Sequence, residues 1–228
     1  MPLVESLRTE ALHSKAMSFD TLAPFYRTME FMLAGSLLQR CRTAYLPNVA
    51  GCRHALLLGE GPGRFLKVFL RMNPQAQVTC VERSPRMIEV AQRELSGCER
   101  ARVQFVQADV LSWRPPQAGF DLVVTNFFLD CFRPEELSEL VAMIAARATA
   151  DAHWLLADFR QPERGWRRWR GRVVLTLMYQ FFRHVTALSA TRLTSPDDYL
   201  KAGGFKLSAR RLGNFGLLHS DLWQRVVS

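Results

Sequence analysis

The chain has 228 residues and is nearly half apolar (48%), enough to bury the core of one sizeable domain, and it contains no internal repeat or low-complexity linker. Its formal charge is +9, but the excess is arginine, with 26 arginines against 4 lysines, as a GC-rich coding sequence would produce whatever the function. Charge alone therefore selects neither a nucleic acid nor an anionic membrane as a partner.

Three features bear on location and metal binding. Glu5, Arg8 and Glu10 interrupt the apolar core that a signal peptide would need, so we expect a cytoplasmic protein. The longest apolar run, 173–182, is about half of the roughly 20 residues that a membrane-spanning helix requires. No cysteines form a C-x-x-C pair, which predicts reduced thiols and no metal site; they are Cys41, Cys52, Cys80, Cys98 and Cys131.

In chain order, short apolar runs alternate with segments of helical period, a pattern typical of parallel strands joined by crossover helices. The predicted strands are 54–59, 77–82, 102–108, 120–126 and 153–159. The predicted helices are 64–72, one that Ser84 caps, one from Pro134, 171–188 and 195–202. Two final strands, 205–212 and 217–226, form a hairpin at the sheet edge. The fold class is therefore α/β, a Rossmann-like doubly wound, mostly parallel seven-stranded sheet with helices on both faces and a C-terminal antiparallel hairpin.

The first predicted strand ends in a glycine turn. Gly59, Gly61 and Gly63 allow the backbone to turn tightly into the next helix and to approach a ligand closely. The spacing is G-x-G-x-G, and Arg64 stands where the dinucleotide fingerprint G-x-G-x-x-G would have its third glycine, so NAD is disfavoured. Glu60 lies inside the turn.

The next two strand ends carry carboxylates. In an open parallel sheet, ligands bind beyond the carboxyl ends of the strands, where the strand order reverses. Glu82 is positioned to accept both ribose hydroxyls of an adenosine, and Asp109 to accept from the adenine amino group, with Val110 against the ring. The alternatives left open are a solvated Glu82 and a helix-capping or loop Asp109. Arg83 and Met87 complete this predicted site.

The fourth strand brings Asn126 and Asp130 to the same edge, where the reacting group would lie if the adenosine covers the first two strands. Asp130 is a candidate general base, and His184 on the predicted helix 171–188 is the second candidate. The open alternatives are a helix cap for Asp130 and an ordinary helix histidine for His184.

Four segments, LLLGEGPGRF, VTCVERSPRM, VQADVLSW and FDLVVTNFFLDCF, occur in an order and spacing that resembles the class I S-adenosylmethionine-dependent methyltransferases over residues 50–160. The segment FDTLAPFY resembles the amino-terminal element of the ubiquinone and menaquinone biosynthesis type, in which a tyrosine approaches the cofactor. The resemblance implies S-adenosyl-L-methionine as cofactor, a role for Tyr26 and no metal.

One residue departs from that family pattern. The family usually has an acid two positions before the first glycine, where this chain has Leu57. Glu60 or Asp158 could compensate at the methionine end of the cofactor, or Arg64 could meet its carboxylate; a Glu60 that is merely buried or solvated is the alternative.

The resemblance also implies an organisation within one domain. It comprises an N-terminal helical cap (1–50), a cofactor-binding core (51–160), a substrate-covering helical insertion (161–203) and terminal strands (204–228).

Aromatic residues in the insertion suit a small apolar or aromatic acceptor, although aromatic residues at helical spacing also form simple core. The arginine-rich RGWRRWRGR segment is compatible with contact to an anionic membrane, with holding an acidic acceptor, or with a solvated face. Oligomeric state is not readable.

Two alternatives to small-molecule methyl transfer stay open. A nucleic-acid methyltransferase would use the interleaved Trp and Arg residues to stack on and neutralise RNA. Against it, the fourth strand ends in Asn126-Phe127-Phe128-Leu129, without the two prolines typical of base-methylating enzymes. A non-catalytic cofactor-binding partner subunit is the other alternative. A nicotinamide-dependent oxidoreductase is disfavoured by Arg64 and by the lack of a Tyr-x-x-x-Lys pair.

Overall fold

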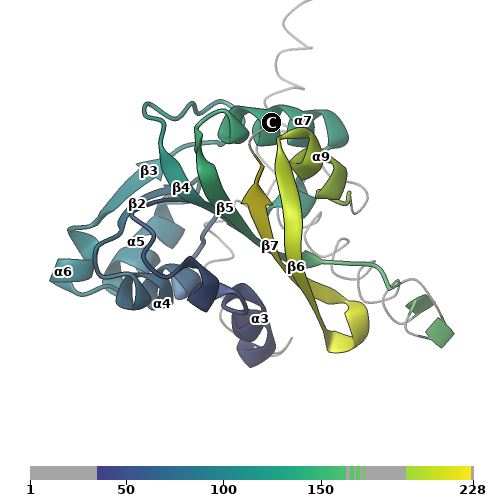
Figure 1. Ribbon diagram of the computed structural model, residues 1–228. Helices are drawn as coiled ribbons and strands as arrows, with labels where there is room; N and C mark the ends of the chain where they lie inside the picture. The colour runs from purple at the N-terminus through teal and green to yellow at the C-terminus, as the bar shows by residue number, and fades with distance from the viewer. Residues whose placement is uncertain (1–34, 163–164, 167, 170–171, 173–193, 227–228) are drawn as a thin grey trace, which may run out of the picture.

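The computed structural model describes residues 35–226 except 163–164, 167, 170–171 and 173–193. Within this part, seven strands form one sheet in the order β3-β2-β1-β4-β5-β7-β6 (Figure 1). The first five in that order are parallel, and β7 is antiparallel to both of its neighbours. The strands are β1 (His54–Leu58), β2 (Gln77–Glu82), β3 (Val103–Gln107), β4 (Phe120–Asn126), β5 (Ala148–Phe159), β6 (Phe205–Gly213) and β7 (Leu218–Arg225). The predicted fold class is confirmed.

Two layers of helices cover the sheet. On one face, apolar residues of α4 and the 3-10 helix η1 form a core with the inward residues of β1, β2 and β4. On the other face, α7 and α9 pack around Trp154 and Trp223. The helices are α3 (Gly35–Arg42), η1 (Leu46–Val49), α4 (Arg64–Met72), α5 (Pro85–Arg93), α6 (Gly97–Arg100), η2 (Leu129–Cys131), α7 (Pro134–Ala145), α9 (Asp197–Ala202) and η3 (Asn214–Gly216). None of the helices within these residues has the length and apolar character needed to cross a membrane.

The strand order reverses at β1. Both β2 and β4 pair with β1 in parallel, and the chain adds β3 on one side and β5 on the other. All five parallel strands therefore end at one edge of the sheet, with the reversal between β1 and β4. Open α/β sheets bind ligands at such a switch point.

Most predicted boundaries agree with the structure, and the exceptions have local causes. The first strand stops at Leu58 because Gly59 takes a left-handed φ of 64°. Ser84 does cap α5, as predicted, by accepting from Met87 N at 3.2 Å. A separate helix, α6, follows because Ser96 and Glu99 form a capping box. The predicted helix 171–188 and most of the predicted N-terminal cap lie outside the described residues.

The C-terminal hairpin is fixed to the core by β7, which pairs with β5 over its whole length. Trp154 of β5 is fully buried, donates its indole N–H to Thr125 Oγ1 at 2.8 Å, and meets Phe205 of β6 edge to face at 5.4 Å between ring centroids. The hairpin thus places the first residues of β7 at the same edge where β4 and β5 end.

Candidate functional site

The glycine turn after β1 has an open side. Gly59, Gly61 and Gly63 have φ of 64°, 65° and 81°, conformations that L-residues rarely adopt. A Cβ placed on Gly61 would meet no atom of the described residues within 4 Å. Among those residues, nothing fills the space above the middle of the turn, although its left-handed backbone disfavours a side chain there.

The two outer glycines are needed for packing. A Cβ on Gly59 would lie 2.1 Å from the Phe128 ring, and one on Gly63 would lie 2.9 Å from the Cα of Ala91 in α5. The turn therefore fits between the segment after β4 and helix α5. Only Gly61 faces open space, so the three glycines have different structural roles.

Glu60 holds the turn against α4. Its Oε1 accepts from the N–H groups of Phe65 and Leu66 at 2.9 Å each, which satisfies two free amides of the first helical turn. Burial raises the pKa of Glu60 to about 7, although these two hydrogen bonds and the charge of Arg42 lower it. The described contacts of Glu60 thus fix the glycine turn to α4, and its contact with the methionine end of a cofactor stays a prediction.

Glu82 links the ends of β1 and β2. Its Oε2 accepts from Gly61 N at 3.1 Å, and its Oε1 accepts from Ser84 N at 2.9 Å. The carboxylate is partly exposed and lies at the edge of the open space above Gly61. It is therefore placed to accept hydrogen bonds from a ligand that lies across the turn.

The other residues of the predicted cofactor set lie around this point. Asp109 Oδ1 accepts from Leu111 N at 3.0 Å, and Arg83 Nη1 lies 3.8 Å from Asp109 Oδ2 in an exposed ion pair. Val110 and Met87 are buried. The structure thus brings together the predicted residues that follow β1, β2 and β3.

Leu57 and Arg64 flank the turn. Leu57 is fully buried in the core between the sheet and α4, so the position that usually carries an acid is apolar here. Arg64 is the first residue of α4, and its carbonyl accepts from Gln39 Nε2 at 3.1 Å. This contact ties α3 to the turn.

A second polar group lies at the ends of β4 and β5. Asn126 is only 8% exposed, and neither polar atom of its amide has a hydrogen-bond partner among the described residues. Asp130 is buried in η2 and is not the cap of α7, because Arg133 occupies that cap position and its N–H donates to Glu136 at 3.0 Å.

Asp158, the penultimate residue of β5, is 1% exposed. Its Oδ1 accepts from Phe159 N at 2.8 Å, while its Oδ2 is buried with no hydrogen-bond partner in the described part of the chain. Burial raises the pKa of Asp158 well above its usual range, and the charge of Asp130 raises it further. The side chain therefore favours the neutral acid.

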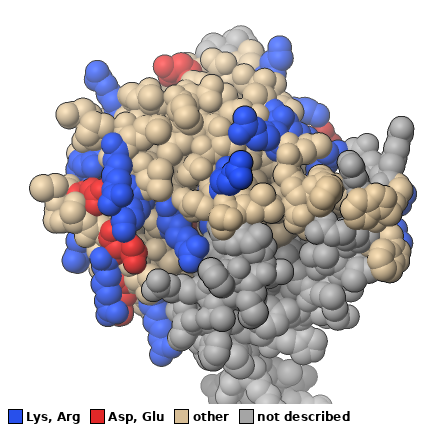
Figure 2. Space-filling model, turned by 90° about the horizontal axis from the view of Figure 1, so that it is seen from below, with Lys and Arg blue, Asp and Glu red and all other residues tan. Residues whose placement is uncertain are grey.

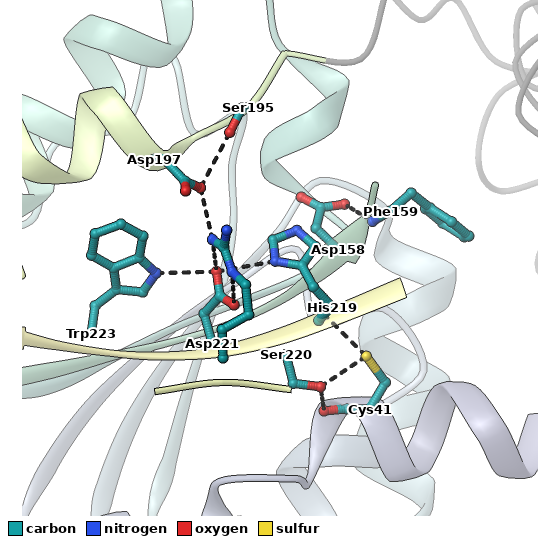
Figure 3. A network of polar contacts seen from close by, with 10 residues as sticks. Cys41, Asp158, Phe159, Ser195, Asp197, His219, Ser220, Asp221 and Trp223 are labelled. Carbon is teal, nitrogen blue, oxygen red and sulfur yellow. Dashed lines mark hydrogen bonds and ion pairs between the residues drawn. The ribbon is translucent and has the colours of Figure 1, made fainter. Parts of the chain in front are cut away.

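Further polar residues at this edge were not selected from the sequence (Figure 3). His219 at the start of β7 is the cross-strand partner of Asp158, and its Nδ1 lies 3.0 Å from Oδ2 of Asp221. Arg210 of β6 forms a bidentate pair with Asp221 at 2.6 and 2.7 Å. The sequence contained one indication of this group: His219 and Asp221 are two residues apart in a predicted strand, so their side chains lie on the same face.

Arg42 of α3 is a further residue that the sequence did not indicate. It is buried, and its guanidinium carbon lies 5.1 Å from the ring centroid of Phe127. Phe127 has a left-handed φ of 55°, a strained conformation for a residue other than glycine, and its ring lies 5.1 Å from that of Phe159. Nothing in the local sequence pattern marks Arg42, because it arrives from another element.

Two predicted site residues, Tyr26 and His184, lie outside the described residues. In the part that is described, no group of His, Cys, Asp and Glu side chains is arranged to hold a metal ion.

Basic side chains on the face shown in Figure 2 have acidic side chains among them. Ion pairs among the described residues include Lys67 with Glu94 at 2.9 Å and Arg71 with Glu99 at 3.3 Å. Part of the positive charge is therefore paired at the surface.

Comparison with known proteins adds to this geometry. Residues 55–151 match the family described as "Methyltransferase domain". The chain is 33% identical over 117 residues to malonyl-[acyl-carrier protein] O-methyltransferase of Paenibacillus sp. (strain JDR-2), covering 50% of this chain and 40% of that protein. It is also 33% identical over 98 residues to trans-aconitate 2-methyltransferase of Klebsiella pneumoniae (strain 342), covering 42% and 36%. The match thus spans about 40% of the length of each relative.

Solved structures share the whole fold. The 1,6-didemethyltoxoflavin-N1-methyltransferase of Burkholderia thailandensis, solved with its acceptor and S-adenosylhomocysteine, has a TM-score of 0.62 and 19% identity over 99% of this chain and 90% of that one. A mitomycin 7-O-methyltransferase gives a TM-score of 0.67 and 18% identity over 97% and 67%. At these identities the likeness is one of fold.

Proposed function

Because the chain carries a class I S-adenosylmethionine-dependent methyltransferase domain, we propose that it binds S-adenosylmethionine across the ends of β1, β2 and β3 and transfers the methyl group to a small organic acceptor. The observation that carries this proposal is the open space above Gly61, with the Glu82 carboxylate at its edge. The exposed carboxylate of Asp109 lies beyond it, after β3.

The residues at the turn fit the proposed cofactor. Glu82 would accept from the ribose hydroxyls, Asp109 would accept from the adenine amino group, and Val110 would pack against the ring. Arg42, which is buried beside the turn and near enough to lower the pKa of Glu60, would attract the cofactor carboxylate in place of a contact through position 57. Arg83, Met87 and Asn126 are proposed as further cofactor contacts because they lie at or next to the ends of β2 and β4, around the glycine turn.

The cofactor, when bound, supplies a methyl group that its positively charged sulfur has already activated. The protein must align the acceptor with that methyl group, exclude water and, for a protonated acceptor, remove a proton. Among the described residues, Asp130 is the candidate that the sequence indicated for removing this proton. Asp130 lies near Asp158, at the ends of β4 and β5, which supports a position on the acceptor side of the switch point, away from the proposed adenine position.

An apolar or aromatic acceptor is the finer part of the proposal. Aromatic side chains surround the ends of β4 and β5, with Phe127 against Phe159, and Phe128 meeting Phe132 edge to face at 5.0 Å. The relatives above carry names of methyltransferases that act on small or carrier-bound molecules, which supports a small organic acceptor over a nucleic acid but does not bear on its apolar character.

The proposal is tested by the affinity for S-adenosylhomocysteine of Glu82→Ala, measured by equilibrium dialysis. Loss of two charge-assisted hydrogen bonds should cost about 2 to 4 kcal/mol, or about 30-fold or more in Kd. Glu89→Gln is the matched control, because Glu89 lies on α5 and forms only an exposed ion pair with Arg93. Equal affinity of the Glu82 variant and the unmodified protein would contradict the proposed cofactor position.

A further inference from the structure

We infer that His219 is the catalytic base of this methyltransferase and that the acceptor binds through a hydroxyl group between His219 and Asp158. The inference rests on the proposed function and names the substrate class for the same site. It is carried by the position of the two side chains, which are cross-strand partners at the edge where β5 ends and β7 begins.

The two side chains face the same side of the sheet. Side chains alternate along a strand, so Asp158 shares a face with Trp154, and His219 shares a face with Trp223. Both tryptophans belong to the core under α7 and α9. Figure 3 shows the His219 ring beside the Asp158 carboxyl group. A hydroxyl group placed at the strand ends can therefore meet both.

The contacts of Asp221 define which nitrogen of His219 can accept a proton. Burial raises the pKa of Asp221, but hydrogen bonds from Arg210 and His219 outweigh it and lower the pKa below its usual value. An ionised carboxylate can only accept, so the Nδ1 of His219 donates to it, as does the indole N–H of Trp223 at 3.3 Å. In the neutral ring this leaves Nε2 as the proton acceptor.

Charged side chains around Asp221 hold it and His219 in place. Asp221 has three donors in Arg210, His219 and Trp223, and Arg210 also reaches Asp197 at the start of α9 at 2.9 Å. Asp221 is therefore a positioning residue that fixes the ring orientation of His219, which is itself only 4% exposed. A base held this way loses little freedom when a substrate binds.

Asp158 is the second residue that would hydrogen bond to the acceptor hydroxyl, opposite His219. Its buried Oδ2 lacks a hydrogen-bond partner among the described residues, and such an atom costs about 1 to 3 kcal/mol if nothing satisfies it. An acceptor hydroxyl would provide that partner. Burial and the nearby charge of Asp130 raise the pKa of Asp158 and favour its neutral form, so this side chain offers a hydroxyl a hydrogen bond but offers a carboxylate no cation.

The reaction step balances without a further reactant. The O–H bond of the acceptor breaks and its proton passes to Nε2 of His219, while the oxygen electron pair forms a bond to the methyl carbon. The bond between sulfur and that carbon breaks, and its electron pair stays on sulfur to give S-adenosylhomocysteine. His219 then returns its proton to water.

The first test reads the imidazole directly. In the ¹⁵N-labelled full chain, His219→Gln identifies the His219 ring signals by their disappearance. The inference expects a proton on Nδ1, where the ring meets Asp221. A proton on Nε2 with none on Nδ1 would overturn it. The assignment requires that the other histidine signals stay in place in His219→Gln, which shows that the variant is folded.

The second test measures methyl transfer to 2-naphthol and 2-naphthoate, which share one ring system. We expect turnover of 2-naphthol by the unmodified protein and a fall of about 10²- to 10⁴-fold in His219→Gln. The charged groups packed around His219 are Asp158 opposite it on β5, Asp221 at its Nδ1, and Arg210, which joins Asp221 to Asp197. The control is His54→Gln, which changes an exposed histidine at the opposite end of the sheet.

The outcomes separate this inference from the proposed function. If the protein binds S-adenosylhomocysteine but methylates only 2-naphthoate, or neither compound, the inference is wrong and the proposed function stands. Undiminished transfer to 2-naphthol by His219→Gln would also overturn it. Failure of the unmodified protein to bind S-adenosylhomocysteine would contradict both.

Discussion

At the scale of single residues, the carboxylates at the strand ends differ in how many hydrogen bonds they accept within the described fold. Glu60 accepts two helix amides, and Asp221 accepts from three side chains. Asp158 instead keeps one buried oxygen without a partner among the described residues, and Glu82 lies beside open space. Glu60 and Asp221 thus shape the loop and the hairpin, while Glu82 and Asp158 are the acids that we propose as ligand contacts.

The raised pKa of Glu60 predicts a pH-dependent stability. The pKa is about 7 in the folded protein against 4.5 for an ordinary glutamate, so the folded state holds a proton that the unfolded state releases. The contribution of Glu60 to the free energy of unfolding is therefore complete below about pH 4.5 and is lost as the pH rises toward 7. Glu60→Gln keeps an oxygen that accepts from both helix amides and cannot ionise. Urea unfolding at about pH 5 and about pH 8 should show the variant gaining stability relative to the unmodified protein as pH rises.

The control for that experiment is Glu89→Gln, because Glu89 is exposed on α5 and outside the turn. Its urea midpoint should follow that of the unmodified protein at both pH values. Parallel pH curves for Glu60→Gln and the unmodified protein would show that Glu60 does not carry a proton in the folded state.

At the scale of elements, helix α5 and the glycine turn fit together only because position 63 has no side chain. The nearest atoms to a Cβ there belong to the Ala91 backbone and side chain, which cannot rotate away. The turn, α4 and α5 therefore form one packed unit, and the shape of the open space above Gly61 depends on it.

Gly63→Ala should destabilise the protein by about 1 to 3 kcal/mol, because it combines a left-handed φ of 81° with a contact at 2.9 Å. The affinity for S-adenosylhomocysteine should fall as well. Gly97→Ala is the matched control, since Gly97 is the first residue of α6 and its added Cβ meets no atom within 4 Å. Equal unfolding midpoints for the two variants would contradict the packing argument.

The sequence predicted β2, β4 and α4 to the residue, because each is an uninterrupted apolar or amphipathic run with a turn or cap residue at its end. It also indicated the strand ends where Glu82, Asp109 and Asn126 lie. It did not indicate Arg42, His219 or Arg210 as site residues, because these reach the edge from α3, β7 and β6. Such convergence depends on strand order and hairpin pairing, which local pattern does not contain.

At the scale of the whole molecule, the parallel half of the sheet and the C-terminal hairpin meet at one edge. The glycine turn and Glu82 come from the first part of the chain, and His219 with Asp221 come from the last. The proposed cofactor and acceptor positions therefore lie on opposite sides of the switch point between β1 and β4. A ligand bound as proposed would contact residues from both ends of the described chain.

Ligand binding at that edge should stabilise the whole fold. S-adenosylhomocysteine at about 100 times its Kd adds about 2.7 kcal/mol to the free energy of unfolding, which for a chain of this size raises Tm by about 5 to 10 °C. NADH at the same concentration should leave Tm unchanged. A larger shift with NADH in a thermal melt would contradict the assignment of the glycine turn to S-adenosylmethionine.

The most direct test of the central claim is calorimetric titration of the unmodified protein with S-adenosylmethionine, with S-adenosylhomocysteine, NADH and a short RNA as parallel titrants. The account predicts micromolar, one-to-one binding of the first two and no heat from the others. Tight binding of RNA or NADH without binding of either S-adenosyl compound would contradict it.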